Sequence, residues 1–263
     1  MLTALALRAD LRRSGAVAER NFVVHRRGWI VLLSGFLEPF FYLLSLGIGL
    51  GKLVGDVPLP GGGSVAYPVF VAPAMLAVQA MNAALTETTF NVFGKFKYMK
   101  LYDAVLATPV TTTDLALGEI GWCLARGGLY SAAFLGIMAA LGLTPSAWAV
   151  LAWPAAVLIG FAFAALGMAL TTFMRSWQDF DVVMVIIMVM FMFAGTFSPL
   201  SAYPGWTRPL IEVLPLYHGV ALTRGLTTGT LSLALLGHAA YLLGCCLLGL
   251  WVAGRRMSRL LMA

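Results

Sequence analysis

Uninterrupted apolar stretches of about 20 residues recur along the chain, which is the length a helix needs to cross a hydrocarbon layer about 30 Å thick. The stretches are continuously apolar and do not alternate with polar residues, so they favour helices over the strands of a membrane barrel. We therefore predict an all-α integral membrane protein with six transmembrane helices, near residues 29–51, 67–91, 115–142, 147–174, 181–200 and 231–254.

The segments between the predicted helices differ in character. Residues 1–28 mix apolar side chains with arginines, which is typical of a helix on the membrane surface, although a positively charged flank fits the composition equally well. Residues 52–66 are rich in Gly and Pro and predict an irregular connection. Residues 93–109 show helical spacing. Residues 200–226 are partly apolar but interrupted by three prolines, which predicts short helices that dip into the outer leaflet.

Composition and charge support this picture and give it an orientation. Only 11% of the 263 residues are charged and 60% are hydrophobic, with a mean hydropathy of +0.90, whereas soluble domains carry about 25% charged residues. With the N-terminus inside, thirteen Lys and Arg residues fall on the cytoplasmic side and three on the outer side. The positive-inside rule then places both termini in the cytoplasm, and we expect a multi-pass protein of the bacterial inner membrane.

The residues that often carry chemistry are sparse. The three cysteines lie in apolar runs without metal-like spacing, and the three histidines are far apart in the sequence, so neither a disulfide framework nor a metal site is predicted. The stretch GIGLGK has only three residues between Gly47 and Gly51 and no Ser or Thr after Lys52, so it fails as a phosphate-binding loop. These two glycines instead indicate close packing between membrane helices.

Ionisable residues inside the predicted spans are candidates for a transport path. Glu38 precedes Pro39 in the first span, Glu87 lies near the inner end of the second, and Glu119 and Arg126 share one face of the third. Such residues usually face a protein interior or water. A structural role, in which Glu38 bonds a neighbouring helix, stays open beside the functional one, and a direct pair between Glu119 and Arg126 is doubtful at two helical turns.

Met184, Met188 and Met192 form a stripe along one face of the predicted fifth span. Methionine adapts to irregular apolar shapes, so the stripe could contact a lipid-like cargo or simply pack against other helices. No grouping of residues predicts catalysis.

The order and spacing of four stretches give the chain a family resemblance: ERNFVVHRRGW at 19–29, LEPFFYLLSLGIGLG at 37–51, LYDAVLATPVTTTDLALGEIGW at 101–122, and the segment from 197 to 226. The chain resembles the membrane subunits of ABC-2 type exporters, most closely the nodulation protein J branch. The resemblance implies an N-terminal interfacial helix, a coupling helix at 93–109 and re-entrant outer helices at 200–226. It also implies a separate ATPase chain that binds ATP and Mg.

The predicted coupling helix presents an apolar face that a partner groove could accept. That face consists of Phe96, Met99, Tyr102 and Leu106, surrounded by Lys95, Lys97, Lys100 and Asp103. The lysines could equally hold anionic lipid headgroups.

The leading prediction is a permease subunit of an ATP-driven exporter of a lipid-linked, glycolipid or hydrophobic small molecule. It would act with a second permease copy or a similar permease, and homodimer and heterodimer stay open. Membrane lipids are expected neighbours, and no nucleic acid is expected. The alternative is a proton-coupled secondary transporter that uses Glu38, Glu87 and Glu119, although no inverted repeat supports it.

Overall fold

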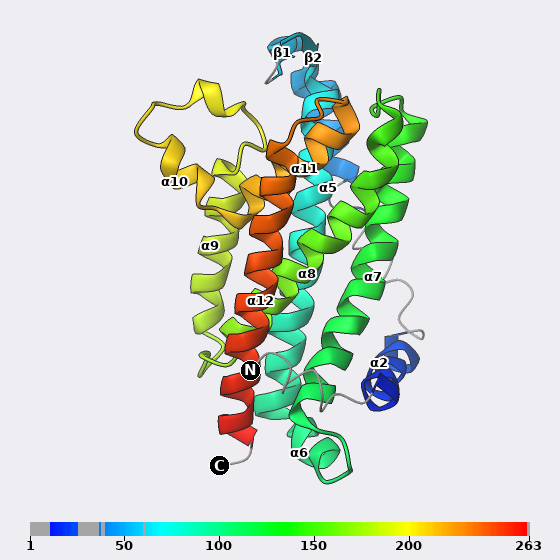
Figure 1. Ribbon diagram of the computed structural model, residues 1–263, viewed down its shortest axis with the longest axis vertical. Coiled ribbons are helices and arrows are strands. Elements are labelled where there is room, and N and C mark those ends of the chain that lie inside the picture. The colour runs from blue at the N-terminus through cyan, green and yellow to red at the C-terminus, as the bar shows by residue number, and fades with distance from the viewer. Residues whose placement is uncertain (1–10, 26–36, 38–39, 60–61, 262–263) are drawn as a thin grey trace.

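The computed structural model describes residues 11–25, 37, 40–59 and 62–261 as a bundle of long helices that lie side by side (Figure 1). The long helices are α5 (Tyr67–Thr86), α7 (Thr112–Ala140), α8 (Ala152–Thr171), α9 (Asp179–Phe193) and α12 (Ala234–Leu261). The other α-helices are α2 (Leu11–His25), α4 (Gly51–Val54), α6 (Leu101–Leu106), α10 (Arg208–Glu212) and α11 (Pro215–Thr228). Single turns complete them: the π-helical η2 (Ser45–Leu50), η3 (Glu87–Asn91) and η4 (Gly94–Tyr98), and the 3-10 helices η5 (Ala147–Leu151) and η6 (Leu200–Ala202).

Helix α5 forms the centre of the bundle, between α7, α8 and α11. It is apolar on all sides, as expected of a helix that other helices enclose. Small residues allow close approach elsewhere in the bundle. A Cβ atom added to Gly249 of α12 would lie 2.5 Å from the backbone carbon of Ala165 in α8, so only glycine permits this crossing.

Four helical stretches among the described residues are long and apolar enough to cross a membrane: Tyr67–Tyr98, Thr112–Ala140, Ala147–Thr171 and Ala234–Met257. They correspond to four of the six predicted spans. The fifth predicted span, 181–200, overlaps α9, but α9 ends at Phe193 and its 15 residues extend only about 22 Å. Of the first, the structure describes residue 37 and residues 40–51: residues 40–44 are helical and lead into η2 and the start of α4.

The predicted cytoplasmic and outer segments separate to opposite ends of the bundle. Helices α2 and α6 lie at the lower end of Figure 1, together with the end of α12, and α10 lies toward the other end. At that upper end, residues 52–66 are less irregular than predicted, because β1 (Asp56–Pro58) and β2 (Ser64–Ala66) pair antiparallel with Val57 opposite Val65. The described residues are thus mostly helical, with one small hairpin.

The segments at 93–109 and 200–226 are both broken into pieces. The single coupling helix predicted at 93–109 is wrong in detail: η4 ends at Tyr98, and Lys100 has a positive φ of 46° before α6 begins. A left-handed residue ends a helix, so the direction of the chain changes there. Short helices do follow residue 200, as η6, α10 and α11, and prolines stand at the first turns of α10 and α11. That they dip into the outer leaflet stays a prediction.

Candidate functional site

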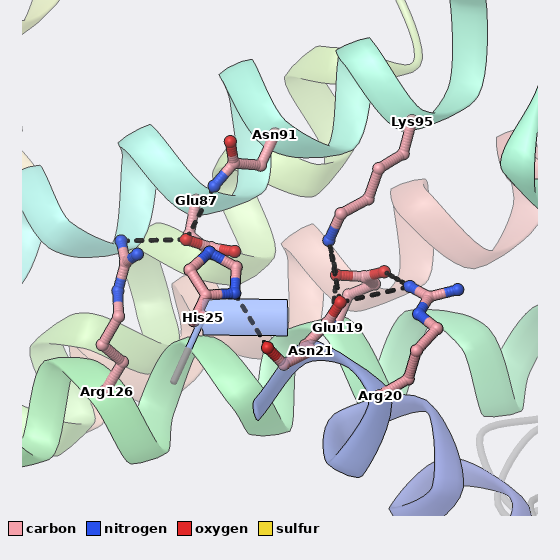
Figure 2. A network of polar contacts seen from close by, with 8 residues as sticks. All are labelled: Arg20, Asn21, His25, Glu87, Asn91, Lys95, Glu119 and Arg126. Carbon is pink, nitrogen blue, oxygen red and sulfur yellow. Dashed lines mark hydrogen bonds and ion pairs between the residues drawn. The ribbon is translucent and has the colours of Figure 1, made fainter. Parts of the chain in front are cut away.

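A buried carboxylate on α7 collects three donors from two other parts of the chain (Figure 2). The Glu119 side chain is 1% exposed. Its Oε1 accepts from Arg20 Nη2 at 2.9 Å, and its Oε2 accepts from Lys95 Nζ at 2.7 Å and from Asn21 Nδ2 at 2.8 Å. Arg20 and Asn21 belong to α2 and Lys95 to η4, so Glu119 joins three elements that are far apart in the sequence.

Asn21 completes this group by bonding to both cations. Its Oδ1 accepts from Lys95 Nζ at 3.1 Å and from Arg20 Nη2 at 3.2 Å. A buried ion is tolerated only when partners replace the water it has lost. Here every member of the group has a charged or amide partner, so the group favours one arrangement of α2, α7 and η4.

A glycine next to Glu119 lets α2 approach closely enough for these bonds. A Cβ atom on Gly118 would lie 2.6 Å from Cβ of Val17 and 2.7 Å from the carbonyl oxygen of Ser14. Real Cβ atoms do not come so close, so any larger residue would push α2 away from α7. Helix α7 itself begins at a capping box, in which Thr111 and Asp114 exchange hydrogen bonds.

A second ion pair lies beside the first group. Glu87 of η3 accepts at Oε2 from Arg126 of α7 at 2.9 Å and from Asn91 Nδ2 at 2.8 Å (Figure 2). Glu119 and Arg126 therefore do not pair directly, as the sequence indicated, but each takes a partner from the α5–η4 stretch. The two groups together fasten the lower part of that stretch to α7.

One residue of the predicted docking face, Tyr102, lies inside the protein. Tyr102 is 1% exposed and its ring packs 6.4 Å from that of Phe96, while Lys95 points to Glu119. Burial, and then the Glu119 charge, raise the pKa of Tyr102 well above its usual value, so the phenol stays protonated. The assignment of Tyr102 to an exposed docking face is wrong, because the α6 helix turns that side chain toward the core.

The surface that stays exposed in this segment is formed by other residues. Met99 is 73% exposed and Tyr98 59%. Lys97, Lys100 and Asp103 are also exposed, and Leu106 is half-buried. A compact surface with apolar and basic side chains therefore lies at the lower end of the bundle, between η4 and α6. We call residues 97–103 without Tyr102 the η4–α6 surface.

An aromatic cluster, which the sequence analysis missed, ties the η4–α6 surface to the start of α9. Trp177 stacks on Tyr98 with ring centroids 5.4 Å apart and on Phe180 at 5.1 Å, and it meets Phe93 edge-on at 5.2 Å. The rings come from two segments about 80 positions apart, so no local pattern could have revealed the cluster. The loop between α8 and α9 is thus in direct contact with the η4–α6 surface.

The remaining path candidates do not gather in this site. Met184, Met188 and Met192 lie on α9 with about half of each side chain exposed, so part of the stripe faces away from the rest of this chain. Glu38 and Pro39 lie outside the described residues. Among the described residues, no cluster of His, Cys, Asp or Glu could hold a metal ion. The site has no residues arranged for catalysis, and what it can do is link a surface to the helices of the bundle.

Comparisons with known proteins agree with this architecture. The family profile described as "ABC-2 type transporter" matches residues 13–227, and the chain belongs to this family of membrane transport proteins. It is 34% identical to Nodulation protein J of Rhizobium leguminosarum bv. trifolii over 81% of this chain and 80% of the relative. It is 31% identical to Nodulation protein J of Neorhizobium galegae over 89% of this chain and 85% of the relative, and 30% identical to Nodulation protein J of Rhizobium meliloti (strain 1021), over 82% and 81%.

Proposed function

We propose that this chain is the permease subunit of an ATP-driven exporter, in which a separate ATPase chain binds ATP and Mg and docks on the η4–α6 surface. Family membership implies an ABC-type ATPase partner. The cargo we propose is a lipid-linked, glycolipid or hydrophobic small molecule. Both termini would then face the cytoplasm, because α2, α6 and the end of α12 lie at the same end of the bundle.

The observation that carries the proposal is the Glu119 group. A docking surface transmits force only if it is fastened to the membrane helices. Lys95 lies two residues before Lys97 of the surface and is bonded to Glu119 on α7, and Arg20 brings α2 into the same group. A displacement of η4 would therefore act on α7 directly and on α2 through Glu119.

We further propose that two permease chains assemble, with α9 in or near the contact. Its apolar side chains, the methionines among them, are largely exposed within one chain. They can be covered by a second copy, a similar permease, lipid or cargo. The methionine stripe suits a cargo of irregular apolar shape.

The alternative, a proton-coupled transporter, finds less support. A carrier carboxylate must gain and lose a proton during transport. Glu87 and Glu119 are each bonded to cations, so a proton would have to displace an ion pair that holds the bundle together. The third carrier of that hypothesis, Glu38, lies outside the described residues.

The test of the proposal is copurification of the ATPase subunit with a Met99→Glu variant. Docking would remove water from the new carboxylate in the centre of the η4–α6 surface, and this costs binding free energy. We therefore expect the amount of bound ATPase to fall at least about tenfold, which corresponds to a loss of about 1.4 kcal/mol in binding free energy. Leu233→Glu is the matched control, because Leu233 is 85% exposed near the beginning of α12.

Equal recovery of the ATPase with both variants, at matched permease expression, would place the docking surface elsewhere. Loss with both variants would show that the added charge disturbs the permease itself. In that case Met99→Ala, which adds no charge, decides the question. If Met99→Ala retains the ATPase and its cargo-stimulated ATP turnover in full, the η4–α6 surface is not the docking surface.

A further inference from the structure

Two histidines that are 20 positions apart in the sequence meet between α11 and α12. The Nδ1 atoms of His218 and His238 are 2.8 Å apart, which is a hydrogen-bond distance. Both rings are half-buried. The histidines are scattered along the sequence, but the tertiary structure brings these two together. The proposed function makes no use of the pair.

The surroundings determine where the protons of the neutral pair lie. Nε2 of His218 is 2.7 Å from the carbonyl oxygen of Glu212, and a carbonyl can only accept. Nε2 of His218 therefore carries the hydrogen, and its Nδ1 presents a lone pair. The shared hydrogen must then belong to Nδ1 of His238, which leaves Nε2 of His238 as the position for a further proton.

The contact survives one added proton but not two. The first proton goes to Nε2 of His238, and the Nδ1–H···Nδ1 bond persists in a charge-assisted form. A second proton on Nδ1 of His218 would replace the acceptor by a donor. Two N–H groups and two positive charges would then face each other across 2.8 Å, so the two rings must separate.

Neighbouring side chains hold the two imidazole rings in place, and among the residues that the structure describes only a few titratable groups lie near enough to affect their charge. The His218 ring stacks on Tyr241 with centroids 3.8 Å apart, and the Tyr241 hydroxyl donates to the carbonyl of Val213 at 2.6 Å. The Tyr217 ring meets His238 at 5.8 Å. The titratable groups that face the pair or its ring partners are Glu212 from α10, Tyr217 and Arg224 from α11, and Tyr241 and Cys245 from α12.

We propose that His218 and His238 form a proton-operated latch that holds α11 against α12 and releases it when both rings are charged. Among the described residues no third His, Cys, Asp or Glu joins the pair to complete a metal site, which favours a proton over a metal ion as its occupant. Imidazole changes charge around pH 6.5, so the latch is closed near neutral pH and opens as the pH falls toward about 5.

Nitrogen NMR of the intact chain, labelled only at histidine and kept in lipid nanodiscs with a chelator, tests the latch. The chain contains three histidines, so the spectrum is simple, and His25 on α2 is the internal control. At about pH 7.5 we expect a protonated Nδ1 on His238, an unprotonated Nδ1 on His218 and a coupling between them through the hydrogen bond. At about pH 5 the coupling should vanish and both rings should be fully protonated.

Thermal melting supplies a second measurement. Lowering the pH over the same range should lower the melting temperature of the wild-type chain by about 2–4 °C more than that of His238→Phe, which has no latch to lose. His25→Phe should retain the wild-type pH dependence. Independent titration of the two rings, without coupling at any pH, would overturn the proposal. So would a shift of both rings, at about pH 7.5, on addition of Zn²⁺ in place of the chelator, because the pair would then be a metal site.

Discussion

At the scale of single residues, Glu119 is the residue of the site that bonds to two other elements, α2 and η4. Its carboxylate compensates two cations from different elements, and no other acid bonds to Arg20 or Lys95 in the part of the chain that the structure describes. The exposed fractions of the two cation side chains are 29% and 13%. Water therefore screens the pair with Arg20 more than the pair with Lys95.

Glu119→Gln should destabilise the protein by up to about 3 kcal/mol, because it leaves two partly buried cations without a counter-charge. The upper limit is reduced by the exposure of Arg20. Melting temperature is the measurement, and Asp103→Asn, which removes an exposed carboxylate, is the control. Equal melting temperatures for the two variants would show that the Glu119 group contributes nothing to stability.

At the scale of elements, the contact between α2 and α7 depends on one missing side chain. Alanine at position 118 cannot be accommodated unless α2 moves, whereas at Gly121 of the same helix an added Cβ meets nothing within 4 Å. Both substitutions raise helix propensity by a similar amount. Their difference therefore isolates the contact with α2.

Gly118→Ala should increase amide hydrogen exchange across α2 and cost about 1–3 kcal/mol through overpacking. Gly121→Ala should leave the exchange of α2 unchanged and be neutral or stabilising. Exchange followed by mass spectrometry distinguishes the two. Unchanged protection of α2 in Gly118→Ala would mean that α2 shifts without loosening. The close approach at Gly118 would then not be what holds α2 against α7.

The aromatic cluster predicts how a second element contributes to coupling. Trp177→Ala removes the ring that joins Tyr98 to Phe180. Under the proposed function, we expect cargo-stimulated ATP turnover of the assembled transporter to fall while the bound ATPase is retained, because docking persists and transmission to α9 weakens. Trp206→Ala is the control, since Trp206 is 75% exposed. Full turnover with Trp177→Ala would exclude the cluster from coupling.

At the scale of the whole molecule, the two ends of the bundle differ. One end carries α2 and the η4–α6 surface with their arginines and lysines, and the β hairpin and α10 lie toward the opposite end. The family supplies the membrane component of a transporter, and the proposed function assigns ATP hydrolysis to another chain. The purified chain should therefore show no ATP turnover, and turnover should appear when the ATPase subunit is added. Turnover by the purified chain alone, unchanged after removal of trace ATPase, would contradict this division of labour.

The sequence by itself determined the class of the protein, because the length and continuity of apolar runs depend on local composition alone. It also located the four long spans that the structure describes, the broken segment after residue 200, and three ionisable residues of the buried groups, Glu87, Glu119 and Arg126. Apolar length is a local property, and a membrane imposes the same requirement wherever a span lies.

The tertiary structure alone decided which partner each ionisable residue has. Helical periodicity placed Glu119 and Arg126 on one face but gave no information about Arg20, Lys95 or Glu87, because those partners come from other elements. Tyr102 was assigned to the surface because its spacing fits an amphipathic helix, and such spacing identifies a face without showing what covers it. The break at Lys100 separates the two parts of that face, so that Tyr102 is buried while Met99 stays exposed. The same limit applies to His218 and His238, whose contact depends on how α11 lies against α12.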